Sequence, residues 1–436
     1  MNVKATYNRR QDANSSDAPP VSAPPTGTES TDLDVIETPE ALARFARILR
    51  RKRVIAVDLE ADSMYHFQER VCLIQIATRQ ENAIVDPLAV PDLADLEPIF
   101  ANPRIEKVFH GADYDIRSLH RDFGIVIHNL FDTQIAARFL GFQETGLEAV
   151  LGREFGVSMD KKYQKKDWSQ RPLPPEMLAY AAEDTTYLIP LARQLQKRLL
   201  RRGRLEWVRE ECELLSQVRA AEDDGPLFLR FKGAGRMPPR DLAILEGVLR
   251  FRRSMAKRKD RPPFKVFGNN AIKRIVETQP ATPEEVEACG AFSRKQLHMY
   301  GRPVAKIVAD ALEIPEADLP TYPRRSGPPL SSQVPQRVKS LKTWRDGRCA
   351  GLDMDPALVL NKSQMTAIAA RNPATLEELA EVEELREWQR AEFGPEILAV
   401  LERLRERAGQ KETKKRRRKR RPRSRKKPPG GNGNGA

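Results

Sequence analysis

The sequence has 436 residues, of which 40% are hydrophobic and 31% are charged, a globular composition that suits about two to four domains. No apolar run reaches the roughly 18 residues that a membrane-spanning helix requires, which excludes a transmembrane protein. The N-terminus has no apolar signal region, and the four cysteines form no paired motif. We therefore expect neither secretion, nor a disulfide framework, nor a zinc ribbon, but a reducing, cytoplasmic location.

The net charge of +14 is concentrated near the C-terminus. Residues 411–427 contain 13 Lys or Arg and one Glu, which leaves 62 of the 75 basic and 60 of the 61 acidic residues elsewhere. The rest of the chain is therefore nearly neutral. We favour a sequence-independent RNA-binding arm for this segment, with a polyanion or ribosome contact and an import-like signal as the alternatives.

The first two-fifths of the chain alternates apolar runs with helical stretches. Residues 1–33 lack apolar periodicity and are predicted to be disordered. A helix follows, with Thr38 as N-cap and Pro39 at its first position. Strands are predicted at 54–57, 71–76, 83–85 and 107–109, the first three as an antiparallel meander, and further helices at 115–123 and 175–200. This order favours a mixed α/β sheet flanked by helices.

After Leu200 the sequence becomes helical and contains an internal repeat with a constant offset of 93 residues. Four segments match at this offset: Phe251-Arg252 with Trp344-Arg345, Pro263 with Pro356, 280–286 with 373–379, and Tyr300-Gly301 with Phe393-Gly394. Two copies of one small all-α domain are therefore predicted. The predicted organisation is a disordered segment 1–33, an α/β domain 34–205, a connecting helix and linker 206–235, a helical domain 236–314, a linker 315–335, a second helical domain 336–405 and a disordered basic tail 406–436.

Two carboxylates follow the first predicted strand, at Asp58 and Glu60. Because they are two residues apart on a strand, both side chains point to one face. Two acids at the end of a buried strand repel each other, and a bound cation is the usual remedy. The alternative is a loop entry with two solvated acids.

Two further segments contain acids or a tyrosine that are candidates for an active site. Asp113 and Asp115 follow a strand and a glycine turn at the start of a helix, where simple helix capping is the alternative. His110 in that turn is read as a structural histidine. Tyr180 and Asp184 are four residues apart and lie on one helical face, although a buried tyrosine beside a solvated acid has the same spacing.

Taken together, this arrangement resembles that of the DEDDy exonucleases, which have an RNase H-like fold. The segments 109–116, 131–133 and 162–173 (FHGADYDI, FDT and KYQKKDWSQRPL) are similar to those of the ribonuclease D family, which includes the nuclear exosome exonuclease. The repeat over about 236–404 resembles two HRDC domains, the layout of bacterial ribonuclease D. The resemblance covers roughly residues 35–405.

The resemblance implies a 3′–5′ exoribonuclease that trims structured RNA such as tRNA precursors by two-metal-ion hydrolysis. It implies that Asp58, Glu60, Asp115 and Asp184 bind two divalent ions, Mg²⁺ or Mn²⁺ rather than zinc, because oxygen ligands favour these ions. Asp115 rather than Asp113 matches the family acid, and Tyr180 is expected to orient the attacking water. A DNA exonuclease and an inactive RNA-binding scaffold are the alternatives, and we expect a monomer without a membrane partner.

Residues outside this set are candidates for contacts with RNA. The candidate contacts are Gln75, Lys161, Lys162, Trp168 and Arg171, with solvated lysines and a packing tryptophan as the alternatives. The first helical copy carries a basic cluster made of Arg250, Arg252, Arg253, Lys257, Arg258 and Lys259. The second copy is less basic there, so we expect the first to bind phosphates, with a solvated helix face, a spacer or a protein-docking module as alternatives.

Overall fold

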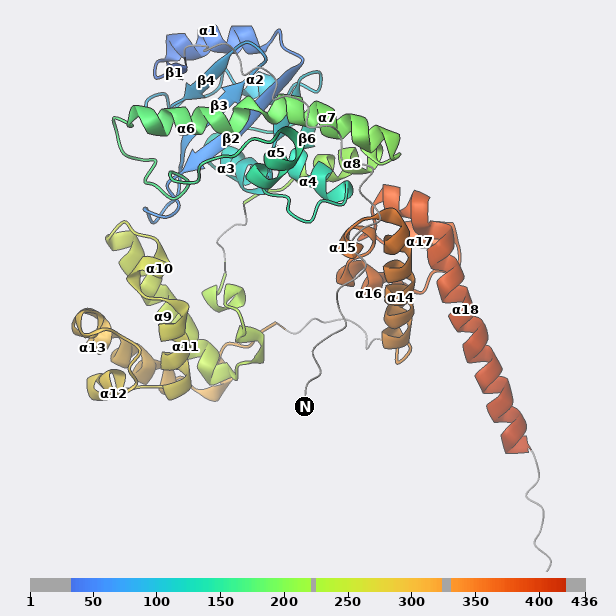
Figure 1. The fold of residues 1–436 in the computed structure, drawn as a ribbon. Coiled ribbons are helices and arrows are strands. Elements are labelled where there is room, and N and C mark those ends of the chain that lie inside the picture. Colours follow the sequence, from blue (N-terminus) through green and yellow to red (C-terminus); the bar gives the residue numbers. More distant parts are fainter. Residues whose placement is uncertain (1–32, 221–224, 324–330, 421–436) are drawn as a thin grey trace, which may run out of the picture. The chain divides into compact units, whose positions relative to one another are not determined.

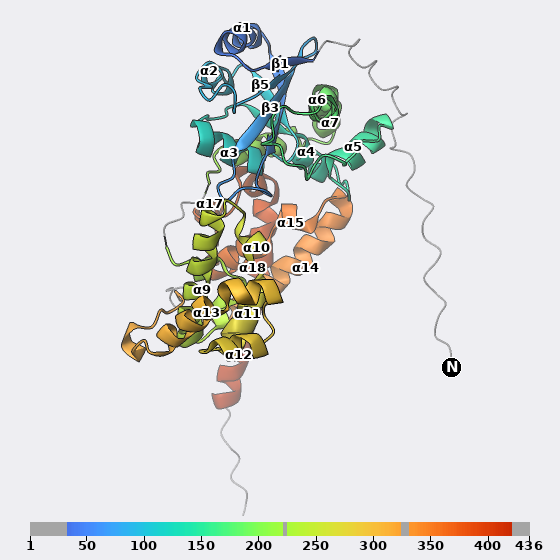
Figure 2. The same ribbon diagram turned by 90° about the vertical axis from the view of Figure 1, so that its left-hand side faces the viewer.

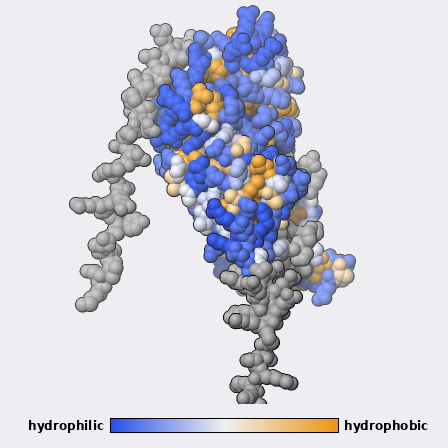
Figure 3. Space-filling model, turned by 90° about the vertical axis from the view of Figure 1, so that its right-hand side faces the viewer, coloured by the Kyte–Doolittle hydropathy of each residue, from blue (hydrophilic) through white to orange (hydrophobic). Residues whose placement is uncertain are grey.

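The computed structural model describes residues 33–220, 225–323 and 331–420, and the chain divides into two compact units, 1–326 and 327–436 (Figure 1). The predictions for residues 1–32 and 421–436 lie outside the described residues. In the part of the chain that is described, no helix is long and apolar enough to cross a membrane. On the face drawn in Figure 3, hydrophilic side chains predominate and hydrophobic ones form small patches.

The first unit begins with a six-stranded mixed sheet in the order β1-β4-β3-β2-β5-β6. Its strands are β1 (Asp34–Ile36), β2 (Val54–Ala61), β3 (Val71–Ala77), β4 (Asn82–Val85), β5 (Glu106–Phe109) and β6 (Leu130–Asp132). Strands β2, β3 and β4 form the predicted antiparallel meander, whereas β1, β5 and β6 pair in parallel with their neighbours. Sequence analysis missed β1 and β6 because a strand of three residues shows no alternation.

Helices cover both faces of this sheet, which confirms the predicted fold class. They are α1 (Pro39–Leu49), α2 (Glu97–Phe100), α3 (Asp113–Phe123), α4 (Thr133–Phe139), α5 (Leu147–Phe155), α6 (Pro175–Thr186), α7 (Leu188–Arg201) and α8 (Leu205–Ser216). Thr38 caps α1 as predicted, accepting a hydrogen bond from the Ala41 amide. In Figure 2 the sheet lies between α1 and α2 on one side and α6 and α7 on the other.

The helix predicted over 175–200 is broken at Tyr187 into α6 and α7. Pro190, in the first turn of α7, has no amide hydrogen with which to continue the hydrogen-bond ladder of α6. The expected connecting helix after residue 205 also differs from its prediction. It is α8, which packs on β6 and α4 and so belongs to the α/β domain.

The helical repeat is confirmed in three dimensions. The first copy contains α9 (Pro239–Arg258), α10 (Pro263–Val266), α11 (Asn269–Thr278), α12 (Pro283–Ala288) and α13 (Arg294–Leu312), and the second contains α14 (Val334–Leu352), α15 (Pro356–Val359), α16 (Lys362–Arg371), α17 (Leu376–Ala380) and α18 (Glu387–Arg420). Equivalent residues make equivalent bonds: Arg252 donates to the Phe267 carbonyl at 3.2 Å, and Arg345 donates to the Leu360 carbonyl at 2.9 Å.

Helix α18 corrects the prediction of a disordered tail from residue 406, because the helix continues to Arg420. The sequence from Gln410 to Arg420 contains neither Gly nor Pro and consists mostly of Lys and Arg, which propagate an existing helix well.

Candidate active site

Four of the five predicted catalytic residues line one cleft of about 470 Å³ in the α/β domain, namely Asp58, Glu60, Tyr180 and Asp184. Asp58 and Glu60 lie on β2, and Tyr180 and Asp184 lie on α6, which packs across β2, β3 and β4. The two-residue strand spacing and the four-residue helix spacing therefore present two pairs of side chains to the same space. Packing of α6 on the sheet brings together residues that are far apart in the sequence.

The structure distinguishes the two acids of the strand-to-helix turn. Asp113 is the first residue of α3, and its exposed carboxylate pairs with Arg117 at 2.8 Å, which lowers its pKa. Asp115 is only 7% exposed, and its charge raises the pKa of Asp58. Asp115 therefore belongs to the carboxylate cluster, although it does not line the cleft surface, and Asp113 is held in a surface ion pair.

The cluster carries strong electrostatic strain. Burial raises the pKa of Asp58 well above its usual value, and the neighbouring carboxylates raise it further. Burial and the charges of Asp184 and Asp115 raise the pKa of Glu60 to about 9. Burial is also the main cause that raises the pKa values of Asp115 and Asp184 to about 7 each. Negative charge is therefore costly in this cleft unless a cation is added.

No ion pair relieves this cost within the residues that the structure describes, because none joins Lys, Arg or His to any of the four acids. Nor do three or more His, Cys, Asp or Glu side chains of the described chain gather closely enough to hold one metal ion. Asp115 and Asp184 thus raise the pKa values of Asp58 and Glu60, although the four acids do not surround one common point. Their oxygen-only donor set suits Mg²⁺ or Mn²⁺.

Tyr180 is held by two aromatic rings from the loop before α6. The ring of Tyr163 makes an edge-on contact with a centroid distance of 5.6 Å, and that of Trp168 stacks at 6.2 Å. Burial and the charges of Asp184 and Glu60 raise the pKa of Tyr180 above its usual value near 10. The phenol is therefore neutral at pH 7 and keeps a proton that it can donate.

The structure places the candidate RNA contacts differently. Lys161 lines the cleft and pairs with Glu148, whereas Lys162 is exposed and lies over the Tyr163 ring. Trp168 is 1% exposed, so it packs against Tyr180 and has no free face for a base.

Arg171 and Gln75 also lie away from the cleft surface. Arg171 donates to the Asp86 carboxylate at 2.6 and 2.8 Å and to the Cys72 carbonyl, which fastens the loop to the sheet. Gln75 is fully buried opposite Asp58 on β3, and its amide atoms have no hydrogen-bond partner among the described residues. The structure thus offers neither Gln75 nor Trp168 a surface for RNA.

Sequence analysis assigned no role to Asp132, yet it organises the turn that carries Asp115. Its carboxylate accepts hydrogen bonds from the amides of Gly111 at 3.1 Å and Ala112 at 2.8 Å, and it also caps α4. His110, beside it, lines the cleft and bonds Thr133 and the Thr145 carbonyl at 2.8 and 2.9 Å. The segment 131–133 was the available signal, because an acid followed by Thr ends a strand there.

Comparison with known proteins places this geometry in context. A model of 3′–5′ exonucleases matches residues 33–200, and a model of the HRDC domain matches residues 241–308 and 335–401. The chain is 33% identical to ribonuclease D of Acidiphilium cryptum, with 70% of this chain and 78% of the relative covered. It is 30% identical to ribonuclease D of Gluconacetobacter diazotrophicus, with 85% and 93% covered.

Solved structures agree with this likeness. The catalytic core of RRP6 from Trypanosoma brucei is 33% identical, with a TM-score of 0.56, and the match covers 67% of this chain and 86% of that one. RNase D of Escherichia coli is 23% identical, with a TM-score of 0.65 and coverages of 86% and 99%, and this match supports the fold.

Proposed function

Because this chain belongs to the ribonuclease D family of 3′–5′ exoribonucleases, which act in RNA processing, we propose that it shortens structured RNA such as tRNA precursors from the 3′ end. The observation that supports the proposal is the convergence of Asp58, Glu60, Asp184 and Tyr180 in a single cleft, with the buried Asp115 acting on the pKa of Asp58. Among the described residues, no cationic side chain is paired to any of these four acids. An inactive RNA-binding scaffold would have no need for this costly charge cluster.

We propose that Asp58, Glu60, Asp115 and Asp184 hold two divalent cations, Mg²⁺ or Mn²⁺. The donor set fits, because every group is a carboxylate whose pKa is raised by burial or by its neighbours. When bound, a pair of such ions lowers the pKa of a water nucleophile and neutralises charge on the leaving oxygen. The carboxylates would position the scissile phosphate only through such ions, and α6 holds Asp184 against β2.

A neutral group, the phenol of Tyr180, and a positive group, the ammonium of Lys161, complete the proposed chemistry. The Tyr180 phenol is fixed by Tyr163 and Trp168, and we propose that it orients the attacking water through a hydrogen bond. Its raised pKa makes it a poor general base. Among the described residues that line the cleft, Lys161 is the one with a positive charge, because burial lowers the pKa of His110 and keeps its ring neutral. Lys161 is therefore the candidate contact for the backbone phosphates.

Digestion of matched RNA and DNA strands tests this function. A 5′-labelled single-stranded RNA should shorten stepwise from its 3′ end in Mg²⁺ or Mn²⁺, and the DNA of the same sequence should shorten much more slowly. A circular RNA should stay intact because it has no 3′ end. Faster digestion of DNA would favour the DNA exonuclease, and binding without digestion of either strand would favour the scaffold.

The pKa shifts predict how stability depends on pH and on metal. A carboxyl group whose pKa rises on folding stabilises the folded state less as pH increases from its ordinary to its raised value. Glu60, with a pKa of about 9, and Asp115 and Asp184, with pKa values of about 7, place this loss between about pH 4 and pH 9. Metal binding displaces the same protons, so it becomes tighter as pH rises.

Thermal unfolding with and without Mn²⁺ measures this linkage. The increase in melting temperature caused by a fixed Mn²⁺ concentration should be larger at pH 8 than at pH 6. Asp58→Asn should lose most of the increase at both pH values. An increase that is the same at both pH values in the unmodified chain would contradict metal binding by these acids.

A further inference from the structure

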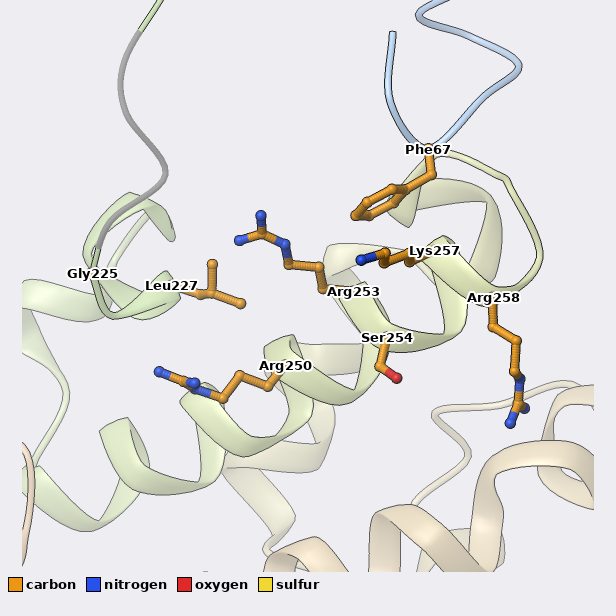
Figure 4. A pocket seen from close by; sticks show the side chains of 8 residues that line it. All are labelled: Phe67, Gly225, Leu227, Arg250, Arg253, Ser254, Lys257 and Arg258. Atoms are coloured by element: carbon orange, nitrogen blue, oxygen red, sulfur yellow. The ribbon is translucent and has the colours of Figure 1, made fainter.

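A second pocket lies where the loop between β2 and β3 meets the first helical copy, within the first unit. It has a volume of about 770 Å³ and is lined by Phe67 of that loop, by Gly225 and Leu227, and by Arg250, Arg253, Ser254, Lys257 and Arg258 of α9. In Figure 4 the side chains of Arg253 and Lys257 extend from α9 beside the Phe67 ring. None of the described lining residues is acidic.

The positive charge of this pocket is not required by the fold of the helical domain. At the offset of 93 residues, the positions of Arg250, Arg253 and Lys257 in the first copy are occupied by Thr343, Asp346 and Ala350 in the second. Position 252, by contrast, is the same in both copies. Arg252 and its equivalent Arg345 both donate a hydrogen bond to a backbone carbonyl. Arg252 therefore has a structural role, whereas the cations at 250, 253 and 257 are specific to the first copy.

The loop is fastened so that Phe67 stays at the pocket. Asp260, two residues after α9, accepts a hydrogen bond from the Phe67 amide at 3.1 Å, and its second oxygen lies 2.7 Å from Nδ1 of His66. The Lys265 ammonium lies 4.3 Å from the centre of the Tyr65 ring. Phe67 is partly buried against the core of the first copy, and its ring also lines the pocket.

An aromatic ring beside a row of cations is the chemistry that binds single-stranded nucleic acid. Bases stack on aromatic rings regardless of sequence, and cations follow the phosphates. Lys257 has no hydrogen-bond or ion-pair partner within the described chain, and Arg250 is paired only with the partly exposed Glu246. An acidic protein segment would use the cations but would not need the ring.

We propose that this pocket binds a nucleotide of single-stranded RNA that lies upstream of the 3′ end held in the active site. Its base would stack on Phe67, and the adjoining phosphates would contact Arg253 and Lys257. Phe67 lies seven residues after Glu60 in the chain, so their Cα atoms are at most about 25 Å apart. The pocket is thus within a few nucleotides of the cleavage site. This inference rests on the proposed exoribonuclease function and adds a substrate subsite to it.

Equilibrium binding without hydrolysis tests the subsite. Fluorescence anisotropy would follow a labelled single-stranded RNA of about 12 nucleotides on the full chain carrying Asp58→Asn, in EDTA. Phe67→Leu keeps an apolar side chain for packing but removes the stacking face, so affinity should fall about 5- to 100-fold without a change in salt dependence. Phe67→Tyr should bind normally. Asp260→Ala, which releases the loop, should weaken binding no further when combined with Phe67→Leu.

The cations give an independent measurement. Lys257→Ala should reduce the slope of log K against log salt by about 0.7, the value for one phosphate contact on a single strand. Lys273→Ala removes the same charge from an exposed position on α11 outside the pocket, and it should leave the slope and the affinity nearly unchanged. Hydrolysis of a saturating dinucleotide should be unaffected by any pocket variant, because so short a substrate cannot reach both sites.

The results separate this subsite from the catalytic function. Wild-type affinity in Phe67→Leu would show that Phe67 only packs the loop, which would overturn the stacking proposal. An unchanged salt slope in Lys257→Ala would overturn the phosphate contact and leave the pocket to an acidic protein partner. A chain that binds RNA through the pocket but never digests RNA would instead refute the exoribonuclease proposal and leave the binding site standing.

Discussion

Asp58→Asn should reduce the rate of RNA hydrolysis by at least about 10⁴-fold, because each metal ion supplies several kcal/mol of transition-state stabilisation. Asparagine has nearly the same shape as aspartate, so no packing is lost. It also removes a buried carboxyl group whose own pKa is raised by burial and by its neighbours, so that its ionisation no longer costs stability. The variant should therefore be folded, and without metal it should be slightly more stable than the unmodified chain at pH 8.

Two further substitutions make this result specific. Asp115→Asn, in the buried cluster, should be nearly as inactive as Asp58→Asn. Asp113→Asn makes the same chemical change on an exposed acid two residues away, which pairs only with Arg117 within the described structure, and it should keep substantial activity. Single-turnover digestion of a labelled RNA measures all three. An active Asp115→Asn together with an inactive Asp113→Asn would move the metal ligand to Asp113.

Tyr180→Phe should reduce hydrolysis by about 10²- to 10⁴-fold, the range for one positioned group that handles a proton. The change removes a single hydroxyl group, and the ring contacts with Tyr163 and Trp168 should persist. RNA affinity, measured in Ca²⁺ to block turnover, should therefore remain close to that of the unmodified chain. The rate loss should appear in the chemical step and not in the binding step.

Tyr163→Phe provides a matched control, because Tyr163 contacts the Tyr180 ring but does not line the cleft. It should leave the rate within a few fold of the original value. A large affinity loss with a normal rate in Tyr180→Phe would make Tyr180 a residue that binds RNA. Equal rate losses in both variants would mean that the aromatic cluster matters only for packing.

The sequence alone determined the local features of this protein. Spacings of two on a strand and four on a helix placed Asp58 with Glu60, and Tyr180 with Asp184, on shared faces, because these periods are properties of the backbone. The resemblance to the DEDDy exonucleases then identified the four as site residues. The repeat at an offset of 93 residues predicted two helical domains, because matching segments at one constant offset indicate two copies of one structural unit. The pattern failed at three-residue strands and at Tyr187, where a proline in the next turn interrupts an otherwise continuous helical pattern.

Only the tertiary structure decided which residues are buried and which partners they have. Asp113 and Asp115 are alike in sequence, but one faces Arg117 at the surface and the other enters the buried cluster. Trp168 packs beneath Tyr180 and is closed to a base. Phe67 has no signal in its own segment, since its pocket exists only where a loop after β2 meets a helix almost 200 residues later. Burial and pairing depend on such long-range contacts, which no local spacing encodes.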